Sequence, residues 1–400
     1  MDVYIQLVHM NKVYAPILAL LFLCAGRLYC IDHIDGSPWN LELSGTVHAA
    51  SNSNVFYDEE DPVSDTVIHL IPGIRVEYEK LDNVLFEGEL ILDSHSYLEN
   101  SDADIVETTL HLQAKPVRSG AYLVFSEDFS IVQNYSAAGG PVETTANYLN
   151  IGGGYRGYHL DVSGKAVFES TSYSEYTDLD YTVTGIEGDI EYLFESFYIL
   201  GGIESGALSY RGDQLNDGNR FSMFAGAGKR FYPKSMIELR VGFLDQTHEQ
   251  DGDEFQGVIY TLSGKHITTS GRSSFRLAID SKVLPSTFAG ADFTEALIIR
   301  YRSRHNITTR IMADISAHFE TDTIGDNRTD SIQEFAVRGS YTPTDVLPLR
   351  FIRRKRKKPP RKQRPRFRID AGIRSRSRTS DDPEYEYDQI TLFAGASVVY

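Results

Sequence analysis

The chain has 400 residues, including 24 tyrosines, 21 phenylalanines and 32 glycines but only 14 prolines. This aromatic content excludes a collagen-like or a disordered chain, and the lack of a second long apolar run after the N-terminus excludes a helical membrane protein. The formal net charge is -17 although segment 353–368 holds eleven basic residues and no acid, so the remainder is strongly acidic and a nucleic-acid partner is excluded.

The first 30 residues have the pattern of a secretory signal peptide. Lys12 precedes the apolar stretch 13–25, which is too short to cross a bilayer. Cleavage is expected near residue 26 or residue 30, and Met10 is an alternative start. Residues 31–40 are expected to form a periplasmic N-terminal segment.

From residue 41 onward, apolar and polar side chains alternate with a period of two. Leu239, Val241 and Phe243, for example, alternate with Glu238 and Arg240. This period predicts strands that lie between an apolar and an aqueous medium. About 18 strands are expected, with 16 as the alternative count. In chain order they span 41–50, 66–79, 84–98, 104–115, 121–132, 145–156, 158–172, 181–193, 197–210, 220–231, 236–248, 254–267, 273–284, 288–302, 307–320, 331–342, 366–377 and 387–400.

The predicted connections alternate in length and charge along the chain. Short connections such as 80–83 and 303–306 alternate with longer acidic connections such as 174–180 and 321–330. Transmembrane barrels have short periplasmic turns and longer outer loops. Residues 41–400 are therefore predicted to form one all-β domain, a transmembrane antiparallel up-and-down β-barrel in the outer membrane of a Gram-negative-type bacterium. The aromatic residues expected in its interfacial girdles are Trp39, Tyr57, Tyr97, Tyr173, Tyr181, Tyr210, Phe231, Tyr232, Tyr341 and Tyr400.

Three short motifs stand near the start of this region: Ser53-Asn54-Val55-Phe56, Ser64-Asp65-Thr66 and Ile71-Pro72-Gly73-Ile74. With the aromatic-rich hairpins that follow, they resemble the beta-barrel porin 2 family. Members of that family are outer-membrane barrels often encoded beside exopolysaccharide synthesis genes. The resemblance implies a barrel fold and a link to exopolysaccharide export. The basic run near residue 355 departs from the family pattern.

If the apolar faces meet lipid, the opposite faces line a pore. Acids are denser before Asp161 and arginines are denser from Arg276 onward, which predicts two walls of opposite sign that orient dipolar solutes. The alternative is that cross-strand ion pairs only hold the wall rigid. The pore-lining candidates are Arg75, Glu77, Glu87, Glu89, Asp161, Lys165, Glu238, Arg240, Arg276, Asp280, Arg300, Arg310, Asp314, Glu334, Arg338, Arg368, Asp370 and Arg374.

A basic insertion, 344–365, separates the sixteenth and seventeenth predicted strands and lies in the periplasm by the alternation of turns. Its charges and prolines favour an extended segment. It is expected to contact an anionic phospholipid or an anionic polysaccharide, or to be a solvated insertion without a partner. The candidate contact residues are Arg353, Arg354, Lys355, Arg356, Lys357, Lys358, Arg361 and Lys362.

Catalytic residues, cofactor sites and metal sites are not expected. His69, His111, His159 and His318 are predicted to face the lumen singly, and the hydrolase and zinc-protease motifs do not occur. The predicted function is a monomeric channel for diffusion of hydrophilic solutes, including saccharides, in contact with outer-membrane lipid. The alternative is a closed structural or adhesion barrel without transport activity.

Overall fold

The computed structural model describes residues 39–55, 62–80, 83–101, 104–135, 141–174, 177–212, 217–231, 234–248, 254–285, 293–324, 328–343, 366–381 and 386–399. The predicted signal peptide and the whole of the basic insertion 344–365, with its eight candidate contact residues, lie outside these ranges. The first strand begins at Trp39, so the predicted N-terminal segment ends two residues earlier than expected.

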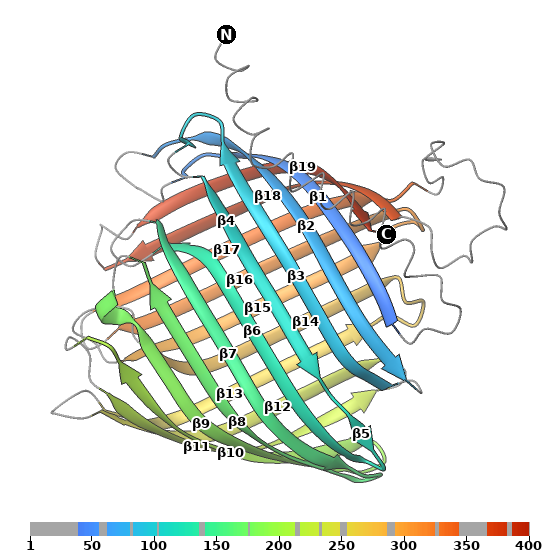
Figure 1. Ribbon diagram of the computed structural model, residues 1–400, viewed down its shortest axis with the longest axis vertical. Coiled ribbons are helices and arrows are strands. Elements are labelled where there is room, and N and C mark those ends of the chain that lie inside the picture. Colours follow the sequence, from blue (N-terminus) through green and yellow to red (C-terminus); the bar gives the residue numbers. More distant parts are fainter. Residues whose placement is uncertain are drawn as a thin grey trace.

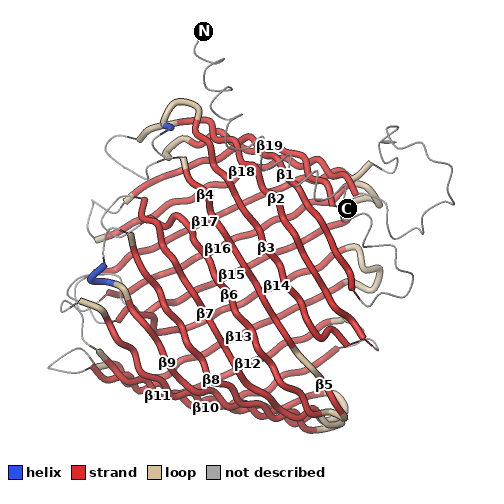
Figure 2. Tube along the Cα trace, viewed as in Figure 1, coloured by secondary structure: helices blue, strands red, loops and turns tan. Residues whose placement is uncertain are grey.

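All of the strands in the described part of the chain belong to a single antiparallel sheet that closes on itself (Figures 1 and 2). Each strand pairs with its neighbours in the chain, and β1 pairs with β19 to close the barrel. The short β5 and the preceding β4 both pair with β6, so they are two parts of one wall strand and the barrel has 18. The strands are β1 (Trp39–Asn52), β2 (Asp65–Lys80), β3 (Asn83–Tyr97), β4 (Ile105–Ala114), β5 (Val117–Arg118), β6 (Ala121–Tyr135), β7 (Pro141–Arg156), β8 (Leu160–Tyr173), β9 (Tyr181–Leu193), β10 (Phe197–Tyr210), β11 (Gly218–Phe231), β12 (Ser235–His248), β13 (Phe255–Ile267), β14 (Ser273–Pro285), β15 (Phe293–Asn306), β16 (Ile311–Ile324), β17 (Arg328–Tyr341), β18 (Arg366–Ser380) and β19 (Tyr387–Val399).

The predicted fold class and the count of 18 are confirmed, but two strands are displaced. Strands expected at 288–302 and 307–320 lie four or five residues later, as β15 and β16, and the turn expected at 303–306 lies at 307–310. The alternation of side chains runs through this turn, so it gives no sequence signal. The turn is stabilised by the Thr308 hydroxyl, which accepts hydrogen bonds from the N–H groups of Arg310 and Ile311.

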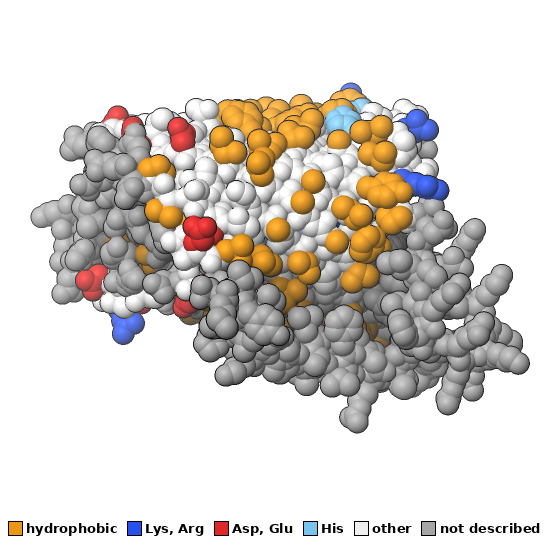
Figure 3. Space-filling model, turned by 90° about the horizontal axis from the view of Figure 1, so that it is seen from above, with side chains coloured by type: hydrophobic (Ala, Val, Ile, Leu, Met, Phe, Trp, Pro, Cys, Tyr) orange, Lys and Arg blue, Asp and Glu red, His pale blue; other side chains and the backbone are white. Residues whose placement is uncertain are grey.

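The outer face of the barrel is apolar and the inner face is polar. In β12, Leu239 and Val241 are both 47% exposed and point outward, whereas Glu238 and Arg240 point inward and pair with each other at 2.7 Å. Figure 3 shows hydrophobic side chains spread over the outside of the wall, with charged groups towards its two ends. Burying this face in lipid removes apolar surface from water, and closure of the sheet pairs most of its backbone groups within the wall. Among the described residues, no helix is long and apolar enough to cross a membrane.

Apart from the connection between β17 and β18, the short turns and the long connections collect at opposite ends of the barrel (Figure 1), which we name the turn end and the loop end. At the turn end, Trp39, Phe231 and Tyr341 are exposed, as predicted for a girdle. At the loop end the prediction is wrong for Tyr97 and Tyr210, which are buried. Both pack inward against apolar residues of neighbouring strands and loops. Tyr173 and Tyr181 are partly buried, and Tyr57, Tyr232 and Tyr400 lie outside the described residues.

Three loop-end hairpins share one closing contact. The N–H groups of Tyr97, Tyr173 and Tyr210 each donate to the carboxylate of an aspartate seven residues later, at 2.7 to 2.8 Å. These aspartates are Asp104, Asp180 and Asp217. Burial raises the pKa of Asp104, which lies in the loop. Part of the acidity of the outer connections therefore serves to satisfy backbone donors where a strand ends.

One ladder is shorter than its neighbours. β13 pairs with β14 only between Thr261–Ile267 and Ser274–Asp280, so residues 255–260 and 281–285 are not paired with each other. β14 nevertheless stays paired with β15 up to Pro285. The wall is therefore interrupted between β13 and β14 in its loop-end half.

Candidate functional site: the inner face of the barrel

The inner face carries a network of ion pairs between neighbouring strands. Fourteen of the eighteen predicted pore-lining residues take part in a pair within 4.0 Å. The other four are Glu89, Arg276, Arg310 and Arg368. Of these, Arg310 lies in the turn before β16, because the strand begins later than predicted. The cross-strand ion pairs that were the alternative to a role in selectivity are thus present. They do not remove the difference in charge between the two predicted walls.

The acidic wall extends from β2 to β9. Arg75 lies between two glutamates, 2.8 Å from Glu77 and 2.7 Å from Glu87, and Glu89 is opposite it in the ladder. Lys165 pairs with Glu187 at 2.9 Å. The sequence reasoning missed Glu187 and its inward-facing neighbours on β9, Asp189 and Glu191, although they alternate with the apolar Ile186 and Ile190 in the usual way.

The basic wall extends from β13 to β18. Arg302 and Arg304 share Asp314, at 3.2 and 3.1 Å. Arg276 lies opposite Arg302 on one side and Lys265 on the other, and within the described part of the chain it has no ion-pair partner. This wall therefore presents unbalanced positive charge. In a barrel of 18 strands it lies across the lumen from the acidic wall.

The seam where the barrel closes is held by buried charge. The Asp370 carboxylate is fully buried and forms an ion pair with Arg338 of β17, and His48 Nε2 of β1 lies 3.4 Å away. His48 passes over Gly395 of β19, where a Cβ would lie 1.8 Å from its ring. The glycine thus lets the imidazole of β1 reach across β19 to β18. The first strand of the barrel is thereby joined to β18, near the other end of the chain.

On the side away from the seam, aromatic rings fill the space over glycines. Tyr198 is only 1% exposed and lies over Gly228, where a Cβ would be 2.2 Å from its ring. Its hydroxyl donates to Glu238 at 2.5 Å, and the Arg230 guanidinium lies 4.8 Å from its ring centroid. Glu238 is fixed in turn by Arg240 at 2.7 Å. This cluster makes the wall rigid between the two charged regions.

The loop-end half of β14 leans into the lumen. Arg220 of β11 donates to the carbonyl oxygen of Val283 at 3.0 Å, although β12 and β13 lie between these strands. Three strand spacings amount to about 14 Å, more than an arginine side chain can span, so this part of β14 has moved inward. Val283 and the inward-facing Leu244 of β12 are 2% and 0% exposed. Residues 281–285 therefore narrow the lumen on its loop side.

The prediction of single luminal histidines is wrong for His69. It lies directly opposite His48 of β1 and His95 of β3, so three histidines form one row across neighbouring strands. His159 lies in the turn before β8, and its Nδ1 donates a hydrogen bond to the carbonyl oxygen of Leu193 at 2.9 Å. The sequence alone could not predict this row. The spacing of the three histidines along the chain does not show that they meet, and only the strand register brings them together.

The remaining two predicted luminal histidines each pair with one carboxylate. His111 Nδ1 lies 2.5 Å from Asp128, and His318 Nε2 lies 2.8 Å from Glu320. Each of these pairs joins one imidazole to one acid.

Asn54 of the first family-like motif and Asp65 of the second hold the connection between β1 and β2 in place. Asn54 is 1% exposed and donates to the carbonyl of Asp388, while Gln389 donates to the carbonyl of Asn54. Asp65 accepts hydrogen bonds from the N–H groups of Thr66, Glu99 and Asn100. These contacts tie the connection after β1 to β19 and to the end of β3.

Comparison with known proteins gives no family for the chain. No family model matches the sequence, and no curated protein matches it. The resemblance to the beta-barrel porin 2 family therefore rests on the three short motifs and the hairpins that follow them.

Solved structures of low sequence identity are similar. OccAB3 of Acinetobacter baumannii has 10% identity and a TM-score of 0.45, covering 90% of this chain and 99% of that chain. OpdK of Pseudomonas aeruginosa, solved with vanillate, has 12% identity, a TM-score of 0.45 and the same coverage. OccK2 of that organism, in complex with glucuronate, has 9% identity and a TM-score of 0.47, covering 90% of this chain and 98% of that chain. The strand order and register of this chain, rather than these likenesses, define its fold.

Proposed function

We propose that this protein is a monomeric, non-enzymatic channel of the bacterial outer membrane through which hydrophilic solutes diffuse. The observation that carries the proposal is the pair of oppositely charged walls inside a closed barrel of 18 strands. Barrels of this size leave an aqueous channel between their walls. Charged side chains that line it keep the channel wet and set up a field across it. The 18 predicted residues, apart from Arg310 in its turn, belong to this lining.

The transverse field favours solutes that are polar without a large net charge. Such a solute aligns its dipole with the field, whereas an anion or cation is attracted to one wall and repelled by the other. Saccharides, with many hydroxyl groups, fit these conditions. The family-like motifs add a link to exopolysaccharide export. The inward lean of residues 281–285 narrows the lumen on its loop side.

A second candidate function is a closed structural barrel. It is favoured by the same lean of β14. Leu244 is buried on the inner face beside it, and the Val283 carbonyl lies within hydrogen-bond distance of Arg220 of β11. A barrel that is closed there would keep its charged walls but would conduct no ions.

Single-channel recording in planar lipid bilayers separates the two functions. The open channel gives discrete, long-lived current steps, and a closed barrel gives none. The double variant Arg276→Glu, Arg302→Glu should shift the reversal potential in a salt gradient towards cation selectivity. The control is Lys229→Glu, since Lys229 is exposed on the outer face of β11. Current steps whose selectivity is changed by the control but not by the double variant would contradict the lining proposed here.

The basic insertion is proposed to bind an anionic surface in the periplasm. Its flanking strands end at Tyr341 and begin at Arg366, both at the turn end. Each basic residue near an anionic membrane contributes about 1 kcal/mol. The residues proposed to make contact are Arg353, Arg354, Lys355, Arg356, Lys357, Lys358, Arg361 and Lys362, all outside the described ranges. Replacement of all eight by glutamine should abolish binding to anionic vesicles in a flotation assay.

A further inference from the structure

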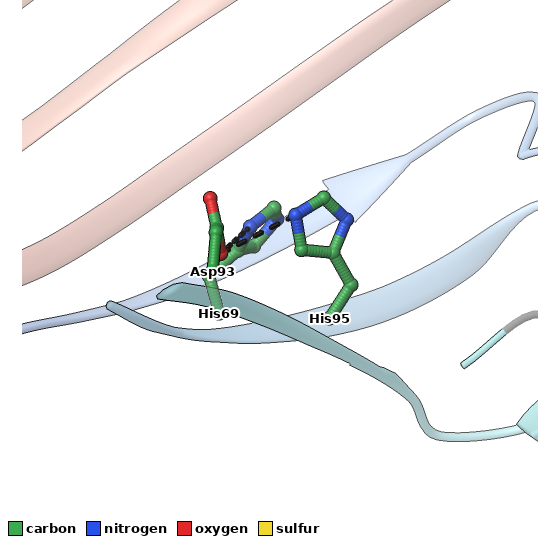
Figure 4. A group of neighbouring side chains, drawn as sticks. All are labelled: His69, Asp93 and His95. Atoms are coloured by element: carbon green, nitrogen blue, oxygen red, sulfur yellow. Dashed lines mark hydrogen bonds and ion pairs between the residues drawn. The ribbon is translucent and has the colours of Figure 1, made fainter. Parts of the chain in front are cut away.

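The row of histidines on the inner face ends in a group of converging ligand atoms. His69 Nδ1 and His95 Nε2 each lie 3.3 Å from the same carboxylate oxygen of Asp93. The two imidazole rings are 4.2 Å apart. One ligand atom from each residue lies within 4.8 Å of the others. Figure 4 shows that the rings come from two adjacent strands and turn towards one carboxylate.

A second carboxylate stands beside this group. Glu107 is directly opposite Asp93 in the ladder between β3 and β4, and its Oε2 lies 3.7 Å from His95 Nε2. All four side chains are partly buried, between 15% and 26% exposed. His95 Nε2 is itself buried and has no hydrogen-bond partner in the described part of the chain. The four residues thus offer two nitrogen and two oxygen ligands from three consecutive strands.

We propose that His69, Asp93 and His95 bind a divalent first-row transition metal ion of the zinc type, with Glu107 as the fourth ligand. Zinc takes imidazole nitrogen and carboxylate oxygen at about 2.0–2.1 Å in a tetrahedron, so neighbouring ligand atoms lie about 3.3 Å apart. The two nitrogen–oxygen distances of 3.3 Å equal that edge. Glu107 does not belong to the three residues whose ligand atoms converge within 4.8 Å. Its Oε1 accepts a hydrogen bond from the Gln133 N–H at 3.0 Å, so its Oε2 would have to move closer to reach the fourth corner.

Ordinary ion pairing accounts less well for this arrangement. The other two luminal histidines pair one to one with a carboxylate, at 2.5 and 2.8 Å. In the proposed site, two imidazoles share one oxygen atom at a longer distance. The buried His95 Nε2 makes no hydrogen bond of good geometry within the described residues, although it lies 3.3 Å from Asp93, and a buried polar atom without such a partner is costly. A bound cation satisfies both nitrogens and the carboxylate together.

The surroundings hold the ligands in place. On the loop side, Ala50, Val67 and Tyr97 form a buried apolar cluster one step further along the same strands. On the turn side, the ladder between β2 and β3 skips Pro72, which has no N–H to donate. Neighbouring His48 is held by Asp370 at 3.4 Å and is not needed as a ligand. A dry support on one side and a fixed histidine on the other limit the freedom of His69.

Zinc binding to the folded barrel in detergent tests the proposal. After treatment with a chelator, titration of the full protein with ZnCl2 in a calorimeter should show one strong site per chain. CoCl2 should give the intense visible absorption bands of tetrahedral Co²⁺. The variants His69→Gln, His95→Gln and Asp93→Asn should each weaken binding at least about tenfold. The matched controls His111→Gln and His318→Gln remove a luminal imidazole from a one-to-one pair and should bind zinc as strongly as the unaltered protein.

The proposal is overturned if the double variant His69→Gln, His95→Gln binds as much zinc as the unaltered protein, or if the controls lose as much affinity as the ligand variants. Electrophoresis in detergent without heating checks that each variant still folds. A variant that forms the barrel keeps the band of the folded protein. The result is independent of transport, since a barrel that conducts ions but binds no zinc refutes the metal site alone.

Discussion

Neighbouring residues of one strand meet different solvents in this barrel. In β12, Val241 lies on the lipid-facing side at 47% exposure, while Arg240 lies in the lumen and contacts Glu238. The same residue type on the two faces should therefore respond differently to a charge. A pair of valines near the middle of their strands, Val241 and the inward-facing Val167 of β8, allows this comparison.

Val241→Arg should lower the free energy of unfolding of the barrel in lipid vesicles by about 2–4 kcal/mol, because it places a cation near the middle of the apolar band. Val167→Arg should have a much smaller effect, since its guanidinium can extend into the water of the lumen. Urea titration of each variant in vesicles measures the difference. Equal losses would show that the two faces have been assigned wrongly.

Asp370→Asn should destabilise the barrel by about 3 kcal/mol, because it leaves the Arg338 guanidinium without its buried partner. Glu334→Gln is the matched control, since its pair with Arg374 is more exposed, at 31% and 55%, and should contribute at most about 1 kcal/mol. Both values come from the same urea titration. A loss in the control as large as that in Asp370→Asn would mean that burial at the seam is not what matters.

The sequence could predict the face of a residue but not its partner. Alternation alone places Lys165 and Glu238 on the inner face, and both are found in ion pairs there. Which residues lie opposite each other depends on the register, and the register is fixed by turns whose signals are weak. The meeting of His69 with His95 could not be predicted for that reason.

At the scale of the strands, the prediction was accurate where turn residues clearly interrupt the alternation. β9 and β10 were predicted at 181–193 and 197–210 and lie at those residues, because Phe194-Glu195-Ser196 interrupts the alternation between them. β15 and β16 are displaced, because the alternation continues through their turn. The inward lean of β14 begins only after Asp280, and the regular alternation of Phe275, Leu277 and Ile279 before it does not predict the lean.

The interrupted ladder between β13 and β14 should be visible in hydrogen exchange. Backbone N–H groups on the facing edges of 255–260 and 281–285 lack a partner strand and should exchange at least about tenfold faster than those of 261–267 and 274–280. Mass spectrometry of peptides from the barrel in nanodiscs measures this. Residues 236–246, paired on both sides, are the internal control. Uniform protection along β13 would show that the wall is continuous there.

At the scale of the whole molecule, the two ends of the barrel have different chemistry and so a defined orientation. The loop end collects the acidic connections and the turn end has the aromatic girdle and the flanks of the basic insertion. Barrels of this kind keep short turns in the periplasm and long loops outside. The charge and length of the connections made this orientation predictable from sequence.

Cysteine labelling of intact cells tests the orientation. Thr177→Cys, exposed at the loop end, should react with a membrane-impermeant maleimide. Glu195→Cys, exposed in a turn, should react only after the outer membrane is permeabilised. The opposite labelling pattern would show that the turn end, and not the loop end, faces the cell exterior.

The pairing of β1 with β19 has a consequence for how the protein is made. Ser44 lies beside Val399, so this contact spans nearly the whole chain, and the cylinder cannot close until β19 has been delivered to β1. Contacts so distant in sequence form slowly. For that interval the remaining strands have an unpaired edge, which favours aggregation. The chain therefore stays at risk of aggregation until β1 and β19 have paired.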